Sequence, residues 1–236
     1  MVGKDLERFS KALRKEADPI WRRILIHPFL IETAKGTLPL SKFQYYLKQD
    51  HAYLFDFTRF LGLAASRCET MDQIRFFSEV LSAEFSFEIE MQRALARKVG
   101  LSPDELTSAK MAPTTKAYTS FLLKVAATEG VGEILAAMSP CPLTYVEIAE
   151  KNVPDEAGRA SPYADWLAAY RSKEAVDVYE RIREMLDEVG EAATASQGRR
   201  MLHNFLDASR YEYLFWEMAY NMSDSSVPGE WLCPGL

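Results

Sequence analysis

Apolar residues recur every three or four positions along most of the chain, which is the spacing that predicts amphipathic helices. A long segment of this kind opens at Ser41, which forms a capping-box pattern with Gln44. The residues that recur on its apolar face are Phe43, Tyr46, Leu47, Tyr53, Leu54 and Phe57.

Two further start signals mark the next helices. Thr70 and Gln73 form a second capping-box pattern, and the helix that follows is predicted to run to about Gly100. Ser102 followed by Pro103 marks a third start, because proline is favoured at the first helical position. The residues predicted to face inward on the helix after Thr70 are Ile74, Phe77, Leu81, Phe85 and Ile89.

The rest of the chain also has helical spacing, and no run alternates with the period of two that marks a strand. Isolated glycines and prolines separate the helical stretches. We therefore predict a single all-α domain over residues 1–221 and an irregular tail over residues 222–236. The further stretches are about 114–129, 131–152 (disturbed by Pro140 and Pro142), 162–171, 173–193 and 196–222.

The charge balance narrows the range of partners. The chain has 236 residues and a formal net charge of −6, and its Lys and Arg residues are scattered. Nucleic acids and anionic membranes attract basic surfaces, so neither is an expected partner. The N-terminus has no apolar signal-peptide core, and the charge-free stretch 134–146 is too short to span a bilayer. We expect a cytoplasmic protein.

Two carboxylates stand on apolar helical faces. Asp50 shares its face with aromatic residues of the segment after Ser41, and Glu212 shares its face with Phe205, Phe215 and Trp216. Neither face carries a basic residue. Burying an unpaired carboxylate is costly, so this placement indicates a site. The alternative is that each acid meets an Arg from another helix or accepts a tyrosine hydroxyl.

The three cysteines are widely spaced, and a cytosolic chain would keep them reduced. Cys141 lies between Pro140 and Pro142, which disfavour an uninterrupted α-helix and would fix the direction of the thiol. The alternative is that Cys141 is a small, inert core residue, which is the usual state of a lone cysteine. We interpret Cys68 and Cys233 in that way.

Aromatic residues indicate a pocket for a flat ligand. Four tyrosines lie on apolar faces of four different segments, and buried phenols need hydrogen-bond partners. Aromatic walls with a few converging polar groups suit a heteroaromatic ring, although core packing explains any single tyrosine equally well. The four are Tyr53, Tyr118, Tyr145 and Tyr170.

The chain lacks the sequence motifs of several enzyme classes. The chain has no GxGxxG, P-loop, GxSxG or HExxH pattern. It has three histidines and no paired Glu-x-x-His motifs of the di-iron type. We expect His27 to end the preceding helix and His51 to be partly exposed. We expect no metal and no cofactor.

Seven short motifs occur in a characteristic order along roughly residues 20–221. They are His27-Pro-Phe29, Gly36-Thr-Leu38, Phe43-x-x-Tyr46, Gln49-Asp50-x-x-Tyr53-Leu54, Tyr118-Thr-Ser, Pro140-Cys141-x-x-x-Tyr145, and Tyr211-Glu-Tyr-x-Phe-Trp216 with Met218-Ala-Tyr220. In their order and spacing these motifs resemble the TenA/thiaminase II family, and the order of all seven makes the resemblance specific.

The resemblance implies a haem-oxygenase-like helical bundle, a homotetramer, and no metal or haem. It also implies hydrolysis at a pyrimidine: release of hydroxymethylpyrimidine from aminomethylpyrimidine and, more slowly, from thiamin. Pro142 stands where an aromatic residue is common in the family, so the pocket wall is expected to differ there.

The resemblance also assigns roles to residues. Cys141 would be the nucleophile, Glu212 the proton shuttle, and Tyr53 the phenol that activates the thiol. Asp50 would bind and polarise the ring's amidine face. The remaining expected substrate contacts are Tyr118, Tyr145, Tyr170 and Phe215.

Two alternatives stand beside this reading. One is a cofactor-free oxidase or oxygenase on the same fold, which would not depend on Cys141. The other is a non-catalytic pyrimidine-binding or regulatory protein. The natural substrate is left open, because a sister group of the family lacks the cysteine and prefers related substrates.

Overall fold

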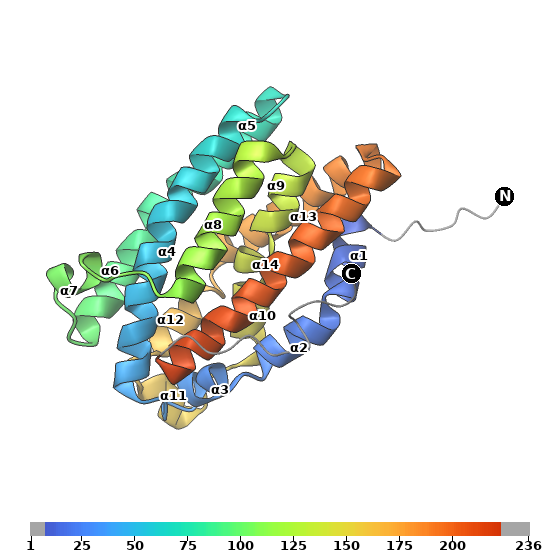
Figure 1. Ribbon diagram of the computed structural model, residues 1–236. Coiled ribbons are helices and arrows are strands. Elements are labelled where there is room, and N and C mark those ends of the chain that lie inside the picture. The colour runs from blue at the N-terminus through green and yellow to red at the C-terminus, as the bar shows by residue number, and fades with distance from the viewer. Residues whose placement is uncertain (1–7, 223–236) are drawn as a thin grey trace.

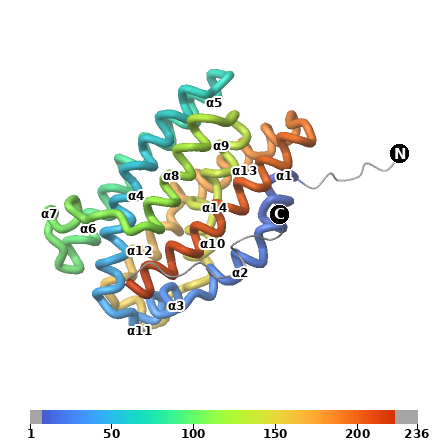
Figure 2. Tube along the Cα trace, viewed as in Figure 1, coloured from blue at the N-terminus to red at the C-terminus, as the bar shows by residue number. Residues whose placement is uncertain are grey.

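Two helices of 27 residues each, α4 (Leu40–Ser66) and α14 (Ala195–Asn221), run through the centre of the computed structural model. The structure describes residues 8–222, and within that range it contains helices and no strand. Figures 1 and 2 show α4, α8 and α14 side by side, with the other helices packed around them. The all-α prediction is therefore confirmed.

Most predicted helices occur close to their expected positions, and the segment 131–152 is divided at Ser139 as its prolines indicated. The other elements are α1 (Phe9–Glu16), α2 (Asp18–Leu25), α3 (Pro28–Ala34), α5 (Met71–Ala83), η1 (Glu84–Glu88), α6 (Ile89–Lys98), α7 (Pro103–Thr107), α8 (Pro113–Thr128), α9 (Val131–Met138), α10 (Pro140–Lys151), α11 (Glu156–Ala160), α12 (Ala164–Ala169) and α13 (Lys173–Ala192).

The helix starts follow the sequence signals in two of three places. Capping boxes form at Thr70 and Ser102, where the side chain of the third helical residue closes each box. The predicted box at Ser41 is wrong: α4 begins at Leu40 after Pro39, and no side chain caps it. Proline presets the backbone angle before a helix, so this start requires no side-chain cap.

His27 was assigned to the wrong helix. We expected it to end the preceding helix, but α2 ends at Leu25, and His27 is the N-cap of α3. Its Nδ1 accepts a hydrogen bond of 3.2 Å from the backbone N–H of Phe29. The imidazole is buried, and burial lowers its pKa to about 4, which keeps it neutral and able to accept that bond.

The helix predicted from Thr70 to about Gly100 is interrupted by a π-helical turn. In η1 the N–H of Ile89 donates to the carbonyl of Glu84, five residues back, so this turn holds one extra residue. The extra residue shifts the phase of the helix. Phe85, which we predicted to face inward, is consequently 58% exposed, and Glu84 and Glu88 turn inward in its place.

The core is a continuous cluster of buried apolar side chains that extends from α1 to α14. Its centre is aromatic: Trp216 of α14 stacks on Tyr46 of α4 at 5.4 Å between ring centroids, and Trp166 of α12 meets both rings edge-on. Aromatic pairs in these geometries add to the stability gained by burial. This cluster holds α4, α12 and α14 in fixed relative positions beneath the pocket described below.

The short helix α11, which the sequence did not predict, packs against α3 through Gly158. A Cβ built on Gly158 would lie 1.8 Å from the carbonyl oxygen of Ala34, so only glycine permits this approach. No helix within residues 8–222 is both long and apolar enough to cross a membrane.

Candidate active site

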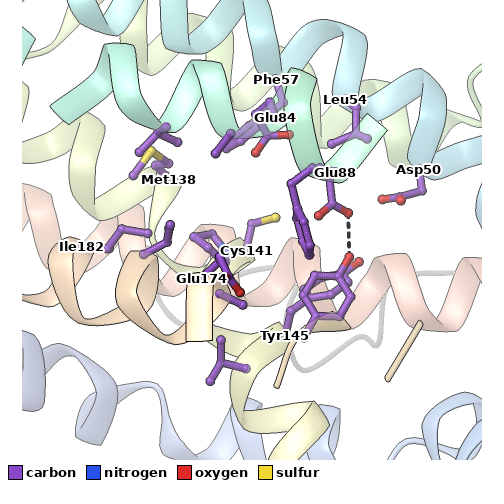
Figure 3. A pocket seen from close by; sticks show the side chains of 18 of the residues that line it. Asp50, Leu54, Phe57, Glu84, Glu88, Met138, Cys141, Tyr145, Glu174 and Ile182 are labelled. Carbon is purple, nitrogen blue, oxygen red and sulfur yellow. Dashed lines mark hydrogen bonds between the residues drawn. The ribbon is translucent and has the colours of Figure 1, made fainter. Parts of the chain in front are cut away.

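A cavity of about 140 Å³ lies between α4, the α5–η1 segment, α10 and α13 (Figure 3). Its walls are apolar and aromatic apart from four carboxyl groups and one thiol. The residues that line it are Asp50, Tyr53, Leu54, Phe57, Val80, Ala83, Glu84, Phe87, Glu88, Met138, Cys141, Pro142, Tyr145, Val146, Tyr170, Glu174, Ala175, Val178 and Ile182.

Cys141 reaches this cavity because the chain turns between two helices immediately before it. Ser139 ends α9 and precedes α10, and Pro140 is the first residue of α10. The first N–H groups of a helix have no intrahelical partner, so Pro140 and Pro142 lose nothing by lacking theirs. The thiol is free and points into the cavity (Figure 3). Burial raises its pKa well above the ordinary value, and Glu212 adds to the rise.

Tyr53 of α4 provides the opposing influence on the thiol. The nearby Tyr53 phenol opposes the rise in the pKa of Cys141, because a donor at the sulfur stabilises the thiolate. The Tyr53 hydroxyl is buried and makes no hydrogen bond with the residues that the structure describes, so it is free to turn toward the sulfur. Burial raises the pKa of Tyr53 well above its ordinary value, which keeps the phenol a donor.

Glu212 of α14 lies behind the wall that carries Cys141. It is 3% exposed, and its Oε1 accepts a hydrogen bond of 2.7 Å from the Tyr118 hydroxyl. Burial raises the pKa of Glu212 to about 7, against the lowering effect of hydrogen bonds from Tyr118, Cys141 and Thr144. A carboxyl group with that pKa exchanges a proton readily at neutral pH.

Asp50 is held by an amide that the sequence analysis did not identify. Its Oδ2 accepts a hydrogen bond of 2.8 Å from Nε2 of Gln92, and Oε1 of Gln92 lies 2.7 Å from Nδ1 of His51. Because Gln92 donates to Asp50 through its nitrogen, its oxygen must accept from His51. Burial raises the pKa of Asp50 to about 7, and the bonds from Gln92 and Tyr46 oppose that rise.

Two acids of η1, Glu84 and Glu88, were also missed. Oε1 of Glu88 accepts a hydrogen bond of 2.6 Å from the Tyr170 hydroxyl, and burial with the nearby charge of Asp50 raises the pKa of Glu88 to about 8. Burial and the charge of Glu88 raise the pKa of Glu84 well above its ordinary value. A signal was available: the two acids lie four residues apart, with no Lys or Arg between Arg75 and Arg93.

The structure brings five of the eight expected site residues into the lining of one cavity and leaves three outside that lining. Asp50, Tyr53, Cys141, Tyr145 and Tyr170 line the cavity, whereas Glu212, Tyr118 and Phe215 are not among its lining residues.

The three residues outside the lining lie one layer deeper. The Tyr118 ring packs on Tyr53 at 5.2 Å between centroids, and Phe215 meets Tyr53 edge-on at 6.1 Å. For Glu212, the alternative weighed from the sequence holds in part, because this acid does accept a tyrosine hydroxyl.

The tyrosines of the far wall form a connected pair. Tyr145 and Tyr170 have ring centroids 4.8 Å apart, and the Tyr145 hydroxyl lies 3.1 Å from that of Tyr46. Their rings are inclined to each other by 58° and offer an apolar surface, and their hydroxyls lead toward Asp50 and Glu88. This wall suits a flat ring that carries hydrogen-bonding nitrogens.

Cys68 is not among the residues that line the cavity. Cys68 follows α4, and its thiol donates to the carbonyl of Ala64 at 3.4 Å. Cys233 lies outside the described residues, as does the tail we predicted to be irregular beyond Met222. Among the residues described, no group of three or more His, Cys, Asp or Glu side chains is arranged to hold a metal ion.

The charge of the cavity is one-sided. Asp50, Glu84, Glu88 and Glu174 line it, and no Lys, Arg or His does. A nucleophilic thiol, a proton-exchanging carboxyl group beside it, and acids facing an aromatic wall can together bind an electron-poor, basic heteroaromatic ring and substitute a group on it.

Comparison with known proteins agrees with this chemistry. The model of the TENA/THI-4/PQQC family matches residues 14–222. An aminopyrimidine aminohydrolase of Halalkalibacterium halodurans is 34% identical over 215 residues, which cover 90% of this chain and 96% of that protein.

Solved structures agree with the fold. A TenA homologue from Pyrococcus horikoshii superposes with a TM-score of 0.82 at 30% identity, covering 91% of this chain and 99% of that one. A domain of unknown function from Shewanella denitrificans, described as having a heme oxygenase-like fold, superposes with a TM-score of 0.74 at 16% identity. It covers 92% of this chain and 97% of that one. The predicted haem-oxygenase-like fold is confirmed.

Proposed function

Because the chain belongs to the TENA/THI-4/PQQC family, we propose that it is a thiamin-salvage hydrolase that releases hydroxymethylpyrimidine from aminomethylpyrimidine and, more slowly, from thiamin. Support for the substrate class comes from relatives named aminopyrimidine aminohydrolase, which are 34% and 30% identical over most of the chain. The catalytic residues of the proposal are Cys141, Glu212 and Tyr53.

One observation carries the proposal: a free thiol points into an acid-lined aromatic cavity and has a carboxyl group with a pKa of about 7 directly behind it. A thiol whose pKa is raised by burial is a poor nucleophile until a base takes its proton. Glu212 is that base, and Tyr53 stabilises the thiolate that results.

The ring is activated from the other side. An aminopyrimidine resists nucleophilic addition until a ring nitrogen is protonated or strongly hydrogen-bonded. Asp50, whose pKa is about 7, binds the amidine edge of the ring and supplies that polarisation. Tyr145 and Tyr170 contact the ring from the far wall, while Tyr118 and Phe215 support Glu212 and Tyr53 from behind.

The reaction then proceeds in two halves. The thiolate of Cys141 forms a C–S bond to a ring carbon, the bond from the methylene carbon to the amine breaks, and Glu212 returns its proton to the leaving amine. Water next adds at the methylene carbon as Glu212 takes one of its protons, and the C–S bond breaks. The products are the alcohol and ammonia, and the thiol regains its proton from Glu212.

We further propose that the protein works in the cytoplasm as a homotetramer and that residues 1–221 form its single domain. Support for assembly comes from large apolar side chains that are exposed on α4, α5 and η1: Phe55 at 66%, Met71 at 73% and Phe85 at 58%. Exposed apolar surface of this kind marks interaction sites. Size-exclusion chromatography with light scattering gives the mass directly.

The test of the function compares wild type with Cys141→Ala in hydrolysis of aminomethylpyrimidine and of thiamin. We expect turnover by the wild type and a loss of at least about a thousandfold in the variant, because removal of a covalent nucleophile disables the whole pathway. Equal turnover would exclude Cys141 as nucleophile. Binding of hydroxymethylpyrimidine without turnover by either protein would favour a binding protein, and oxygen consumption would favour an oxidase.

A further inference from the structure

The two acids of η1 have no part in the reaction proposed above, yet both line the cavity. Glu84 and Glu88 lie one helical turn apart, on the wall that faces Cys141 (Figure 3). Glu88 has a partner in the Tyr170 hydroxyl. Glu84 differs from it, because its Oε2 is buried and accepts no hydrogen bond from the residues described.

An acceptor buried without a donor is costly, and native proteins retain such groups mainly where a ligand or a reaction uses them. The wall offers no cation to Glu84, since no Lys, Arg or His of the described range 8–222 lines the cavity. The missing donor must therefore come from what occupies the cavity. A ligand that brings an N–H and a positive charge would satisfy the oxygen and offset the repulsion between the two acids.

We propose that Glu84 and Glu88 form a subsite for the primary ammonium group of the substrate, and so select an aminomethyl leaving group over a thiazolium. The identity of the ring rests on the proposed function; the subsite itself rests on Glu84 and Glu88. A primary ammonium has three N–H donors, enough for Oε2 of Glu84 and for Glu88 together. A quaternary thiazolium nitrogen has none, so it leaves Glu84 without a partner.

The positions of the other groups agree with this assignment. Asp50 lies beyond Glu88, and the Cys141 sulfur points toward the side of the cavity on which these two acids lie (Figure 3). A ring whose amidine edge meets Asp50 can direct its aminomethyl arm along η1 while a ring carbon faces the thiol. The acids would lose protons when the ammonium binds, because a cation favours their ionised forms. Before the C–N bond breaks, ionised Glu84 takes one proton from the ammonium, so the neutral amine accepts the proton of Glu212 and leaves as ammonia, which then recovers the proton from Glu84.

The experiment measures binding by titration calorimetry in the Cys141→Ala background, which prevents turnover. The ligands are aminomethylpyrimidine, the uncharged hydroxymethylpyrimidine, and thiamin. The variants are Glu84→Gln and Glu88→Gln, and the matched control is Glu79→Gln, an exposed acid on α5 outside the cavity. Titrations in buffers of different ionisation enthalpy count the protons released.

We expect Glu84→Gln to weaken the binding of aminomethylpyrimidine about tenfold or more, and to change the affinity for hydroxymethylpyrimidine less than about twofold. The preference for aminomethylpyrimidine over thiamin should shrink, proton release should fall, and Glu79→Gln should match the parent. Glu88→Gln should show the same selectivity, which provides a second reading if the first variant folds poorly.

Equal losses for the charged and uncharged ligands, or unchanged affinity for the amine, would overturn the subsite. The proposed function fails separately: a wild type that binds the amine selectively through Glu84 without hydrolysing it keeps the subsite and loses the reaction. If wild type hydrolyses the amine and Glu84→Gln does so with the same KM, the reaction stands and the subsite is excluded.

Discussion

The hydroxyl of Tyr118 donates a hydrogen bond of 2.7 Å to Oε1 of Glu212, in the layer directly behind Cys141. Burial alone would raise the pKa of Glu212 further than to about 7, and this bond opposes the rise because it stabilises the ionised carboxylate. Tyr118 therefore tunes the pH at which Glu212 acts as a base without touching the cavity itself.

Replacing Tyr118 by Phe should shift the activity profile to higher pH. Loss of the hydrogen bond raises the pKa of Glu212, so the rising limb of kcat/KM against pH moves upward, and kcat/KM at pH 7 falls by about tenfold. The control is Tyr211→Phe, whose ring stacks on Tyr118 but makes no hydrogen bond to Glu212. A profile that drops uniformly without moving would contradict a tuning role.

Gln92 should control how tightly the ring is bound. Gln92→Leu keeps the size of this buried side chain but removes the 2.8 Å donor to Asp50, so the pKa of Asp50 rises and its ionised form is less available. We expect KM for aminomethylpyrimidine to rise about tenfold with a smaller change in kcat. His51→Ala removes only the outer contact of the amide, and steady-state kinetics should show a lesser effect. Equal effects of the two variants would indicate that the chain of contacts acts through His51.

The buried acids should make the folded state less stable as pH rises toward 8. Asp50 and Glu212 have pKa values of about 7 and Glu88 of about 8, all above the values of about 4 expected in the unfolded chain. The folded state therefore binds more protons than the unfolded state between these limits. The stability that this contributes is complete below about pH 4 and is lost as pH rises through 7 and 8.

The clearest window for this measurement lies between about pH 6.5 and 9. At lower pH His27 has the opposite effect on stability, because its pKa in the folded state is lowered to about 4. There the unfolded chain binds a proton at this histidine that the folded state does not, so falling pH destabilises the fold. We expect the free energy of unfolding in urea to fall across the window. The slope should be smaller in Glu212→Gln, and a slope that this variant leaves unchanged would show that Glu212 does not carry the effect.

The sequence was sufficient for most of the helices and for the residues whose environment is set by their own helix. Asp50 and Glu212 stood out because a charge without a partner on an aromatic stripe is visible from spacing alone. The break in the helix beside Cys141 was visible from Pro140, because proline is favoured in the first turn of a helix. The role expected of the thiol came from the family resemblance and stays a prediction.

What the sequence did not reveal depends on contacts between distant segments or on a break in helical period. Gln92 meets Asp50 across 42 positions of chain, which no spacing rule indicates. Phe85 was misplaced because a uniform α-helical period was assumed through η1. The depth of Glu212 behind the wall likewise depends on how α14 packs against α8 and α10.

The π-helical turn makes the length of this segment a determinant of its chemistry. Because this turn holds one residue more than an α-helical turn, deletion of one residue within Glu84–Glu88 would restore the regular period while α5 and α6 keep their positions. The residues that remain in the turn would then point in new directions, since each residue advances an α-helix by about 100°. A single-codon deletion or insertion at this point is therefore a short evolutionary route between an acid-lined and an apolar cavity, available without substituting any residue.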